Sequence, residues 1–155
     1  MNSFTETYAD VLYLLQKEKL CSLATSYGDN PHVCLMNFTY LVEEDLIILS
    51  SRTNTTKVLH MEKNPSVALL LYSLGGQGEE SKSCTLYGKA TILPAENDRF
   101  YREAHHKNHP AMGTFITGEN ISIIIVRIEH AALSDQADHV QTWSAAPNFK
   151  HDSST

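Results

Sequence analysis

The sequence has few cysteines, no long apolar run and a deficit of positive charge. Its three cysteines, Cys21, Cys34 and Cys84, are an odd number without CxxC spacing, so neither a disulfide framework nor a structural zinc site is expected. No apolar run approaches the ~20 residues that span a bilayer, and the first residues lack the basic and apolar regions of a secretory signal. These absences predict a protein of the reducing cytoplasm with no membrane contact.

Composition narrows the class of protein further. The formal charge is -6, because 12 Lys and Arg are outnumbered by 18 Asp and Glu, so nothing supports a general affinity for nucleic acid or acidic membranes. Hydrophobic residues make up 42% and charged residues 19% of the 155 residues, which excludes a disordered, collagen-like or coiled-coil chain. The length predicts a single domain over residues 1–155, with a polar, disordered tail from about 145 to 155.

Runs of β-forming residues, separated by short polar turns, occupy most of the chain. Six of these runs are predicted to be strands, at residues 20–26, 32–41, 46–51, 66–73, 83–93 and 121–128. Amphipathic patterns predict helices at 4–18, between the polar segment 50–57 and Asn64-Pro65, and from Pro94 to about His109. Residues 131–143 are expected to add a final short extended segment.

The spacing of the strands indicates how they pair. The first three follow one another too closely for crossover helices, so they must form an antiparallel meander. A closed or nearly closed barrel would hide the sheet edges. We therefore predict a mainly β (α+β) fold, a six-stranded antiparallel split β-barrel with capping helices, in which Gly88 marks a bulge or a close backbone approach.

Two strongly apolar strand segments bear on the oligomeric state. Residues 67–72 and 123–126 carry more apolar surface than one face of a small barrel needs. This excess predicts a homodimer.

The segment from Ser50 to Lys57 carries the clearest chemistry. It places hydroxyl side chains, Asn54, Arg52 and Lys57 between a buried strand and a helix start, where backbone N–H groups and cations suit a phosphate monoester dianion. The alternative is a Ser/Thr-rich loop whose Thr55 only caps the helix. The glycine-rich GxxxxGK[ST] spacing is absent, so a nucleotide triphosphate is not indicated.

Four segments occur in order along the chain: Leu23–Val33, Leu49–Lys57, Asn64–Leu69 and Tyr87–Ala90. Together they resemble the pyridoxamine 5'-phosphate oxidase-like flavoproteins and the small bacterial FMN-binding proteins of the same fold, and the resemblance extends over about residues 8–143. It implies a six-stranded antiparallel split barrel, usually a homodimer, with FMN in the cleft between protomers. The function it implies is that of an FMN-dependent oxidoreductase acting on an unidentified small molecule.

The resemblance also implies which residues bind FMN: Leu35, Met36, Asn37, Ser50, Ser51, Arg52, Thr55, Thr56, Lys57 and Trp143. Lys57 corresponds to the family's lysine on the FMN phosphate, with Thr56 beside it. Ser50 and Ser51 match a pair near the phosphate and ribityl chain, and residues 35–37 match the strand that borders the isoalloxazine ring. Trp143 is expected either to stack near the flavin or to seal the dimer. No catalytic acid, base or nucleophile is identifiable.

Two departures from the family pattern concern the substrate. The chain has no Arg after Arg127, where oxidases of vitamin B6 phosphates carry an Arg- and His-containing motif. It also lacks the flavin-binding Gln expected before Gly88-Lys89-Ala90. We therefore expect a flavin site without pyridoxamine phosphate oxidation. A non-catalytic FMN electron carrier and a haem-binding protein of the same fold stay open as alternatives.

Three of the eight histidines, His105, His106 and His109, lie close together. His105 and His109 stand at i, i+4, so a helix would place both on one face at metal-ligand distance. Since no HExxH motif or third ligand accompanies them, no metal site is predicted. A solvated helix end is the expectation.

Overall fold

The computed structural model describes residues 4–74 and 81–145, so the predicted tail lies outside the described residues except for Ala145. The helices are α1 (Phe4–Lys17), α2 (Thr56–Lys63) and α3 (Arg99–Asn108), with short 3-10 turns η1 (Val42–Glu44), η2 (Ala95–Asn97) and η3 (Pro110–Phe115). The strands are β1 (Leu20–Tyr27), β2 (Asn30–Asn37), β3 (Thr39–Leu41), β4 (Leu46–Arg52), β5 (Ser66–Ser73), β6 (Lys82–Ile92), β7 (Ile121–Asp135) and β8 (Val140–Ser144).

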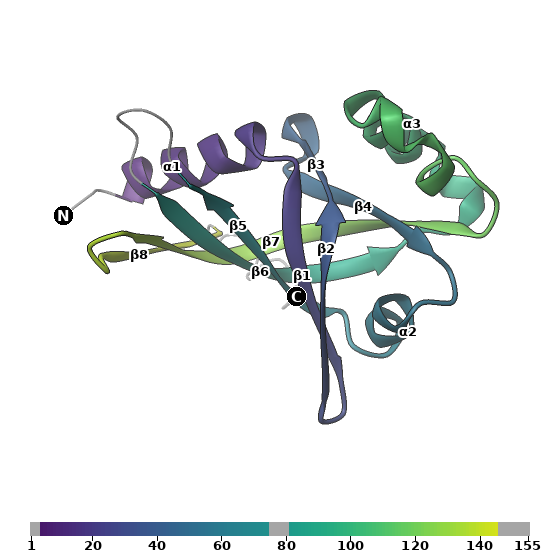
Figure 1. The fold of residues 1–155 in the computed structure, drawn as a ribbon, viewed down its shortest axis with the longest axis horizontal. Coiled ribbons are helices and arrows are strands. Elements are labelled where there is room, and N and C mark those ends of the chain that lie inside the picture. The colour runs from purple at the N-terminus through teal and green to yellow at the C-terminus, as the bar shows by residue number, and fades with distance from the viewer. Residues whose placement is uncertain (1–3, 75–80, 146–155) are drawn as a thin grey trace, which may run out of the picture.

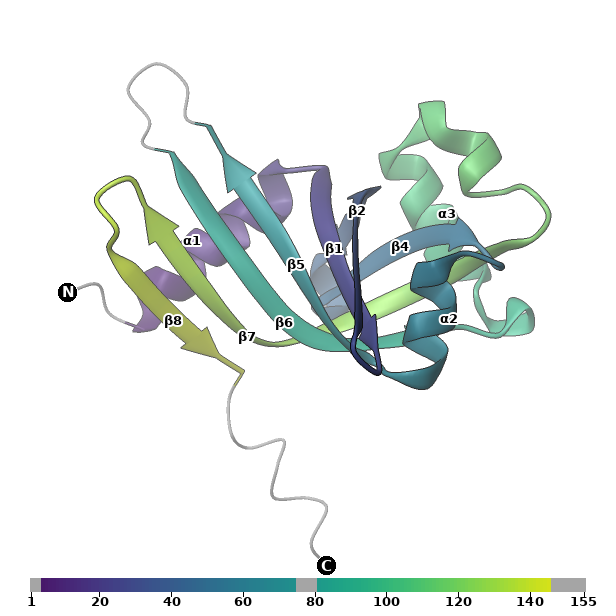
Figure 2. The same ribbon diagram turned by 60° about the horizontal axis from the view of Figure 1, so that its bottom comes forward.

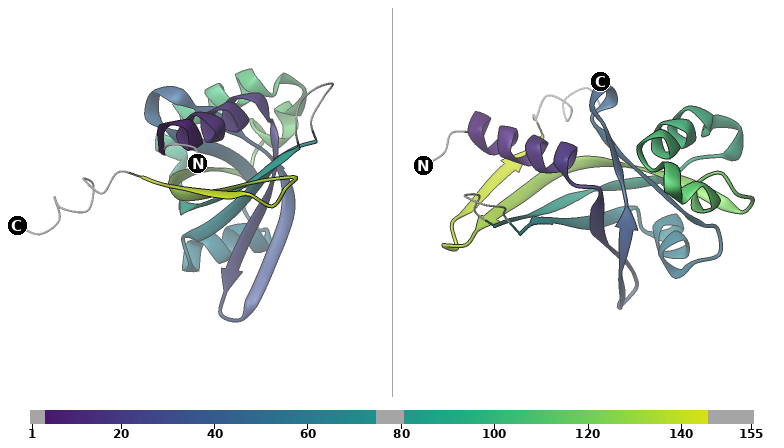
Figure 3. Two further views of the ribbon diagram at one scale, coloured as in Figure 1. Left: turned by 90° about the vertical axis from the view of Figure 1, so that its left-hand side faces the viewer. Right: turned by 45° about the horizontal axis from the view of Figure 1, so that its top comes forward.

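All the strands belong to one antiparallel sheet. Their order is β2-β1-β5-β6-β7-β4-β3, and β8 pairs with β7, as Figure 2 shows for the strands from β8 to β2. The sheet curls into a half-barrel (Figure 3). In Figure 1, α1 lies at one end of the molecule, whereas α2 and α3 lie at the other. The predicted mainly antiparallel β fold is confirmed. None of the helices in the described ranges is both long and apolar enough to cross a membrane.

The predicted number of six strands is wrong, because the sheet has eight. The expected strand 32–41 divides at Phe38, which is fully buried. Before Phe38 the chain pairs with β1, and after it the chain pairs with β4 on the opposite edge of the sheet. The expected last extended segment forms the end of β7 and the separate strand β8.

Strand β7 runs for 15 residues and connects the two ends of the molecule. It pairs with β6 on one side, and on the other side with β4 and then β8. The β6–β7 register shifts between Tyr87 and Gly88. A Cβ atom at Gly88 would lie 2.3 Å from the carbonyl oxygen of Arg127, so the position requires glycine. The predicted bulge and close backbone approach are both confirmed.

The sheet has apolar side chains on both faces where α3 covers it. Leu46, Ile48, Ile123 and Ile125 form a second buried cluster beneath α3, separate from the main core inside the half-barrel. This explains the nearly unbroken apolar run of β4. It also corrects one argument for the dimer, since residues 123–126 are all buried within the chain.

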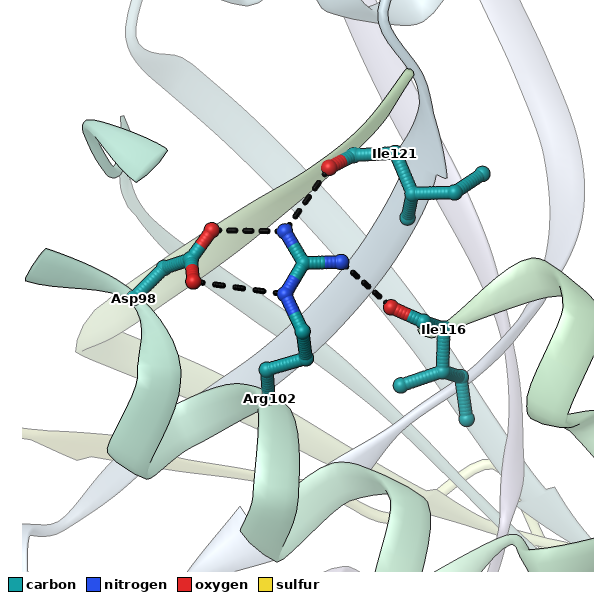
Figure 4. Close-up of polar contacts among 4 residues, drawn as sticks. All are labelled: Asp98, Arg102, Ile116 and Ile121. Atoms are coloured by element: carbon teal, nitrogen blue, oxygen red, sulfur yellow. Dashed lines mark hydrogen bonds and ion pairs between the residues drawn. The ribbon is translucent and has the colours of Figure 1, made fainter. Parts of the chain in front are cut away.

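The predicted helix from Pro94 to His109 begins later than expected. Pro94 is extended, with ψ of 144°, so a short η2 turn precedes α3. The first turns of α3 are fixed by Arg102, whose Nε and Nη2 donate to the two carboxylate oxygens of Asp98 at 3.2 and 2.6 Å (Figure 4). Its Nη1 donates to the carbonyl oxygen of Ile116, and its Nη2 also donates to the carbonyl oxygen of Ile121 at 2.9 Å. Arg102 therefore ties α3 to η3 and to the start of β7.

Two histidines attach the other end of α3 to the junction between β2 and β3. His105 Nδ1 lies 2.7 Å from Thr39 Oγ1, and His109 Nε2 donates to the carbonyl oxygen of Phe38 at 2.7 Å. Both rings are buried, with 0% and 6% exposure, so the expected solvated helix end is wrong. Burial, together with the neighbouring His109, lowers the pKa of His105 to about 3.

Replacing Arg102 with Met should destabilise the protein by about 3 kcal/mol, because the carboxylate of Asp98 would stay buried without its partner. Urea denaturation measures the change in the free energy of unfolding. Arg99→Met is the matched control, since Arg99 pairs with Glu103 at the same i, i+4 spacing in an exposed position and should contribute little. Equal effects of the two substitutions would contradict this assignment.

Stability should fall as the pH drops below about 6.5, the ordinary pKa of histidine, because the unfolded chain then binds a proton at His105 that the folded chain refuses until about pH 3. The loss from this group approaches about 1.4 kcal/mol per pH unit. Urea denaturation of wild type and His105→Gln at several pH values checks the sign. The stability advantage of the wild type should shrink as the pH falls, and a constant difference would refute the argument.

Candidate functional site

A cleft of about 260 Å³ lies between the ends of β2 and β4, the start of α2, α3 and the η3 turn. Its walls come from residues at the ends of β2 and β4, the start of α2, His105 of α3, the η3 turn with the residue after it, and the first residue of β7. These segments are far apart in the sequence, and the curl of the sheet brings the ends of β2 and β4 together.

Most of the residues selected from the sequence line this cleft. They are Leu35, Met36, Asn37, Ser50, Ser51, Arg52, Thr55 and Lys57. Thr56 is exposed beside them at the start of α2 but is not part of the lining. The loop between β4 and α2 and the end of β2 thus form one continuous surface.

Trp143 lies in a different place. It is buried on β8 and stacks against Tyr8 of α1, with ring centroids 5.1 Å apart. Because α1 and β8 are at the opposite end of the molecule (Figure 1), Trp143 does not border the cleft of its own chain.

The β4–α2 end of the cleft is polar and cationic. Ser51 Oγ lies 3.0 Å from Thr55 Oγ1, and Thr55 Oγ1 donates to the carbonyl oxygen of Arg52 at 3.1 Å. Thr55 occupies the N-cap position of α2, yet its side chain makes no capping hydrogen bond. The first N–H groups of α2 are therefore not satisfied by that hydroxyl. The cationic residues Arg52 and Lys57, which lie before this helix and in its first turn, line the same cleft.

An open depression of about 610 Å³ adjoins this cationic end. It shares Arg52, Phe115 and Ile121 with the cleft and extends over Thr53, Asn54 and Glu119. The Arg52 guanidinium lies 6.0 Å from the centre of the Phe115 ring, an arrangement that favours a cation–π contact. The cationic end of the cleft is thus open to solvent on this side.

The cysteines do not supply a nucleophile. Cys34 lies next to the cleft on β2, and burial raises the pKa of its thiol despite the opposing charge of Lys57. Burial raises the pKa of Cys21 and of Cys84 to about 12. All three are therefore protonated thiols at neutral pH, and the reactive species would be the thiolate.

The sequence did not identify the residues that close the cleft opposite β2. These are His105, Met112, Phe115, Ile116 and Ile121. His105 had been singled out for metal-ligand spacing, which is a different role. Within the described ranges, no three His, Cys, Asp or Glu side chains come together as a metal-binding group.

Comparison with known proteins places this geometry in a family. The sequence profile described as pyridoxamine 5'-phosphate oxidase matches residues 8–142. A pyridoxamine 5'-phosphate oxidase homolog of Schizosaccharomyces pombe is 31% identical, over 94% of this chain and 94% of that protein.

Solved structures share the fold at lower sequence identity. A FAD-binding protein from Mesorhizobium loti has a TM-score of 0.69 at 18% identity, over 81% of this chain and 90% of its own. A heme binding protein from Mycobacterium smegmatis has a TM-score of 0.73 at 15% identity, over 93% of this chain and 59% of its own. The resemblance drawn from the sequence motifs is confirmed, and the chain belongs to the pyridoxamine 5'-phosphate oxidase family.

Proposed function

We propose that the protein is an FMN-binding flavoprotein, an FMN-dependent oxidoreductase that acts on a small molecule. The observation that carries the proposal is the convergence of residues 35–37, 50–52, Thr55 and Lys57 on one cleft. The family and a FAD-binding neighbour of the same fold support a flavin as the ligand.

The β4–α2 end of the cleft suits the phosphate of FMN. Lys57 and Arg52 supply positive charge, and the start of α2 supplies N–H groups that the Thr55 hydroxyl leaves unbonded. An anion gains from both the charges and the helix dipole. Thr55 and Ser51 stand close enough to add hydroxyl hydrogen bonds.

The end of β2 suits the ring system of a flavin. Among the described strands, β2 pairs with β1 alone, so one row of its backbone N–H and C=O groups is free of ladder hydrogen bonds. Residues 35–37 of this edge strand line the cleft. A planar ring with alternating donors and acceptors can bond to such an edge.

FMN, when bound, supplies hydride and electron transfer. The contribution of the chain is to bind, orient and enclose. Lys57 and Arg52 hold the anionic end, and Met112 and Ile116 exclude water from the other. The lowered pKa of His105 keeps its ring neutral at physiological pH, so it does not act as a general acid there.

We further propose that pyridoxamine 5'-phosphate is not the substrate. Two phosphates, one from FMN and one from such a substrate, would each need cations. The cations among the described residues that line the cleft, Arg52 and Lys57, both stand at the β4–α2 end.

The alternatives of an electron carrier and a haem-binding protein differ in simple spectra. A flavin spectrum with anaerobic reduction by NADH or NADPH supports the oxidoreductase. A flavin that these donors do not reduce supports the carrier, and a Soret band after haem titration supports haem binding.

We also propose a homodimer, formed by the outer face of the sheet. Neighbouring strands expose apolar side chains on this face: Val33 and Leu35 of β2, Leu70 and Tyr72 of β5, and Tyr87 of β6. Ala24 of β1 pairs with Ala68 of β5 between these residues, and their small side chains leave the face flat. Leu35 belongs both to this face and to the cleft. The cleft of one chain, about 260 Å³, is smaller than the ~300–1,000 Å³ of typical ligand sites. A second copy bound to this face would therefore enlarge the cleft.

Lys57→Ala should weaken FMN binding at least tenfold, equivalent to about 1.4 kcal/mol, because a charge-assisted phosphate contact is lost. Riboflavin, which has no phosphate, should bind almost as before. Fluorescence titration of both ligands measures the difference.

Lys63→Ala is the matched control, because Lys63 is an exposed lysine in the last turn of the same helix. It should bind FMN as the wild type does. Equal losses for FMN and riboflavin in Lys57→Ala, or no loss for FMN, would move the phosphate site elsewhere.

Light scattering of the wild type should give twice the monomer mass of 17.3 kDa. Val33→Glu, which puts a charge on the proposed interface, should raise the dimer dissociation constant at least 100-fold, or about 2.7 kcal/mol. Val42→Glu is the control, since Val42 is 53% exposed on η1 and outside this face. A monomeric wild type, or equal effects of the two substitutions, would exclude this interface.

A further inference from the structure

One nitrogen of His105 has an unused hydrogen-bonding capacity beside the cleft. The side chain is 0% exposed and belongs to the cleft lining. Its Nδ1 lies 2.7 Å from Thr39 Oγ1, whereas its Nε2 is buried with no hydrogen-bond partner among the described residues. His32 Nδ1 is in the same condition, but His32 is not part of the cleft lining.

The contacts of Thr39 suggest which nitrogen of His105 carries the proton. Thr39 Oγ1 accepts a hydrogen bond from Asn108 Nδ2 at 3.1 Å, and its own proton can be donated to His105 Nδ1, which lies 2.7 Å away. In this arrangement Nδ1 is the acceptor and the neutral ring carries its proton on Nε2. This is the tautomer on which the subsite depends. Burial favours this neutral form, with a pKa of about 3.

The printed contacts of His105 are with uncharged groups. Its hydrogen-bond contact is the hydroxyl of Thr39, and the titratable group that acts on its pKa is His109, whose ring centroid lies 5.0 Å away. The Nε2–H of His109 is already used by the carbonyl oxygen of Phe38. The cleft lining also includes the uncharged side chains of Asn37, Met112 and Ile116. A neutral donor in an apolar wall suits a neutral acceptor.

We propose that the His105 end of the cleft is a binding subsite for an uncharged hydrogen-bond acceptor, a carbonyl oxygen or an aromatic ring nitrogen, which bonds to His105 Nε2–H. The proposal rests on the proposed flavin function, because the acceptor belongs either to the flavin ring or to an organic substrate beside it. The subsite differs from the phosphate end in recognising a ligand without charge.

The test compares His105→Leu, which removes the donor, with His105→Gln, whose amide N–H lies near the position of Nε2–H. FMN and riboflavin are titrated first. If the acceptor belongs to the flavin, His105→Leu should weaken both ligands about equally, by roughly 10- to 100-fold, whereas His105→Gln should stay within about threefold of wild type. This pattern is distinct from Lys57→Ala, which should affect FMN alone.

If both variants bind flavin as the wild type does, the second source is tested with FMN-loaded protein. Nicotinamide, which offers an amide carbonyl and a ring nitrogen, should bind at least tenfold tighter than the anion nicotinate. His105→Leu should lose this preference and His105→Gln should keep it. The proposal is overturned if His105→Leu binds both flavin and nicotinamide as the wild type does. It is also overturned if the wild type binds nicotinate more tightly than nicotinamide.

A nuclear magnetic resonance measurement on the full wild-type chain covers the case in which His105→Leu does not fold. With ¹⁵N-labelled histidine, His105 should show a protonated Nε2 and an unprotonated Nδ1, and its Nε2–H signal should shift on addition of FMN or of nicotinamide. An unprotonated Nε2, or no shift with either probe, refutes the subsite. If the wild type does not bind FMN at all, the proposed flavin function is refuted instead. That result differs from both of the outcomes that refute the subsite.

Discussion

Arg102 joins three segments that the chain alone would leave independent: the start of α3, the η3 turn and the first residue of β7. Its guanidinium bonds to both carboxylate oxygens of Asp98 and to the carbonyl oxygens of Ile116 and Ile121. Ile116 and Ile121 are themselves walls of the cleft. The planar fork of Arg is suited to such convergent acceptors, whereas Lys offers a point charge. The position of the cleft wall thus depends on a side chain that does not touch the cleft.

Local sequence patterns predicted the elements that depend on residues only a few positions apart. The predicted strand at 66–73 and the glycine bulge at Gly88 agree with the structure, because alternation and glycine both act over a few residues. The break at Phe38 could not be predicted in this way. It occurs because the chain crosses from one edge of the curled sheet to the other, and the β-forming residues on each side give no local signal for that crossing.

The residues of the candidate site also divide into those with a local sequence signal and those without one. The loop from Ser50 to Lys57 and the end of β2 could be selected from ordered motifs, and they meet in one cleft. The opposite wall could not, because η3 has no repeating apolar pattern and reaches the cleft through the contacts of Arg102. The pair His105 and His109 was visible as an i, i+4 spacing. Its structural use is to attach α3 to Phe38 and Thr39, which only tertiary structure reveals.

Strand β7 has a consequence for how the molecule moves. It pairs with β6 from Ile124 to Asp135, and on its other side with β4 up to Val126 and with β8 from His130. Arg127 and Ile128, between these two partners, are paired on the β6 side alone, and the β6–β7 register shifts at the same level. Bending at this point leaves the β4 and β8 ladders intact. A tilt of the cleft end against the α1 end is therefore expected where β7 passes from one partner to the other.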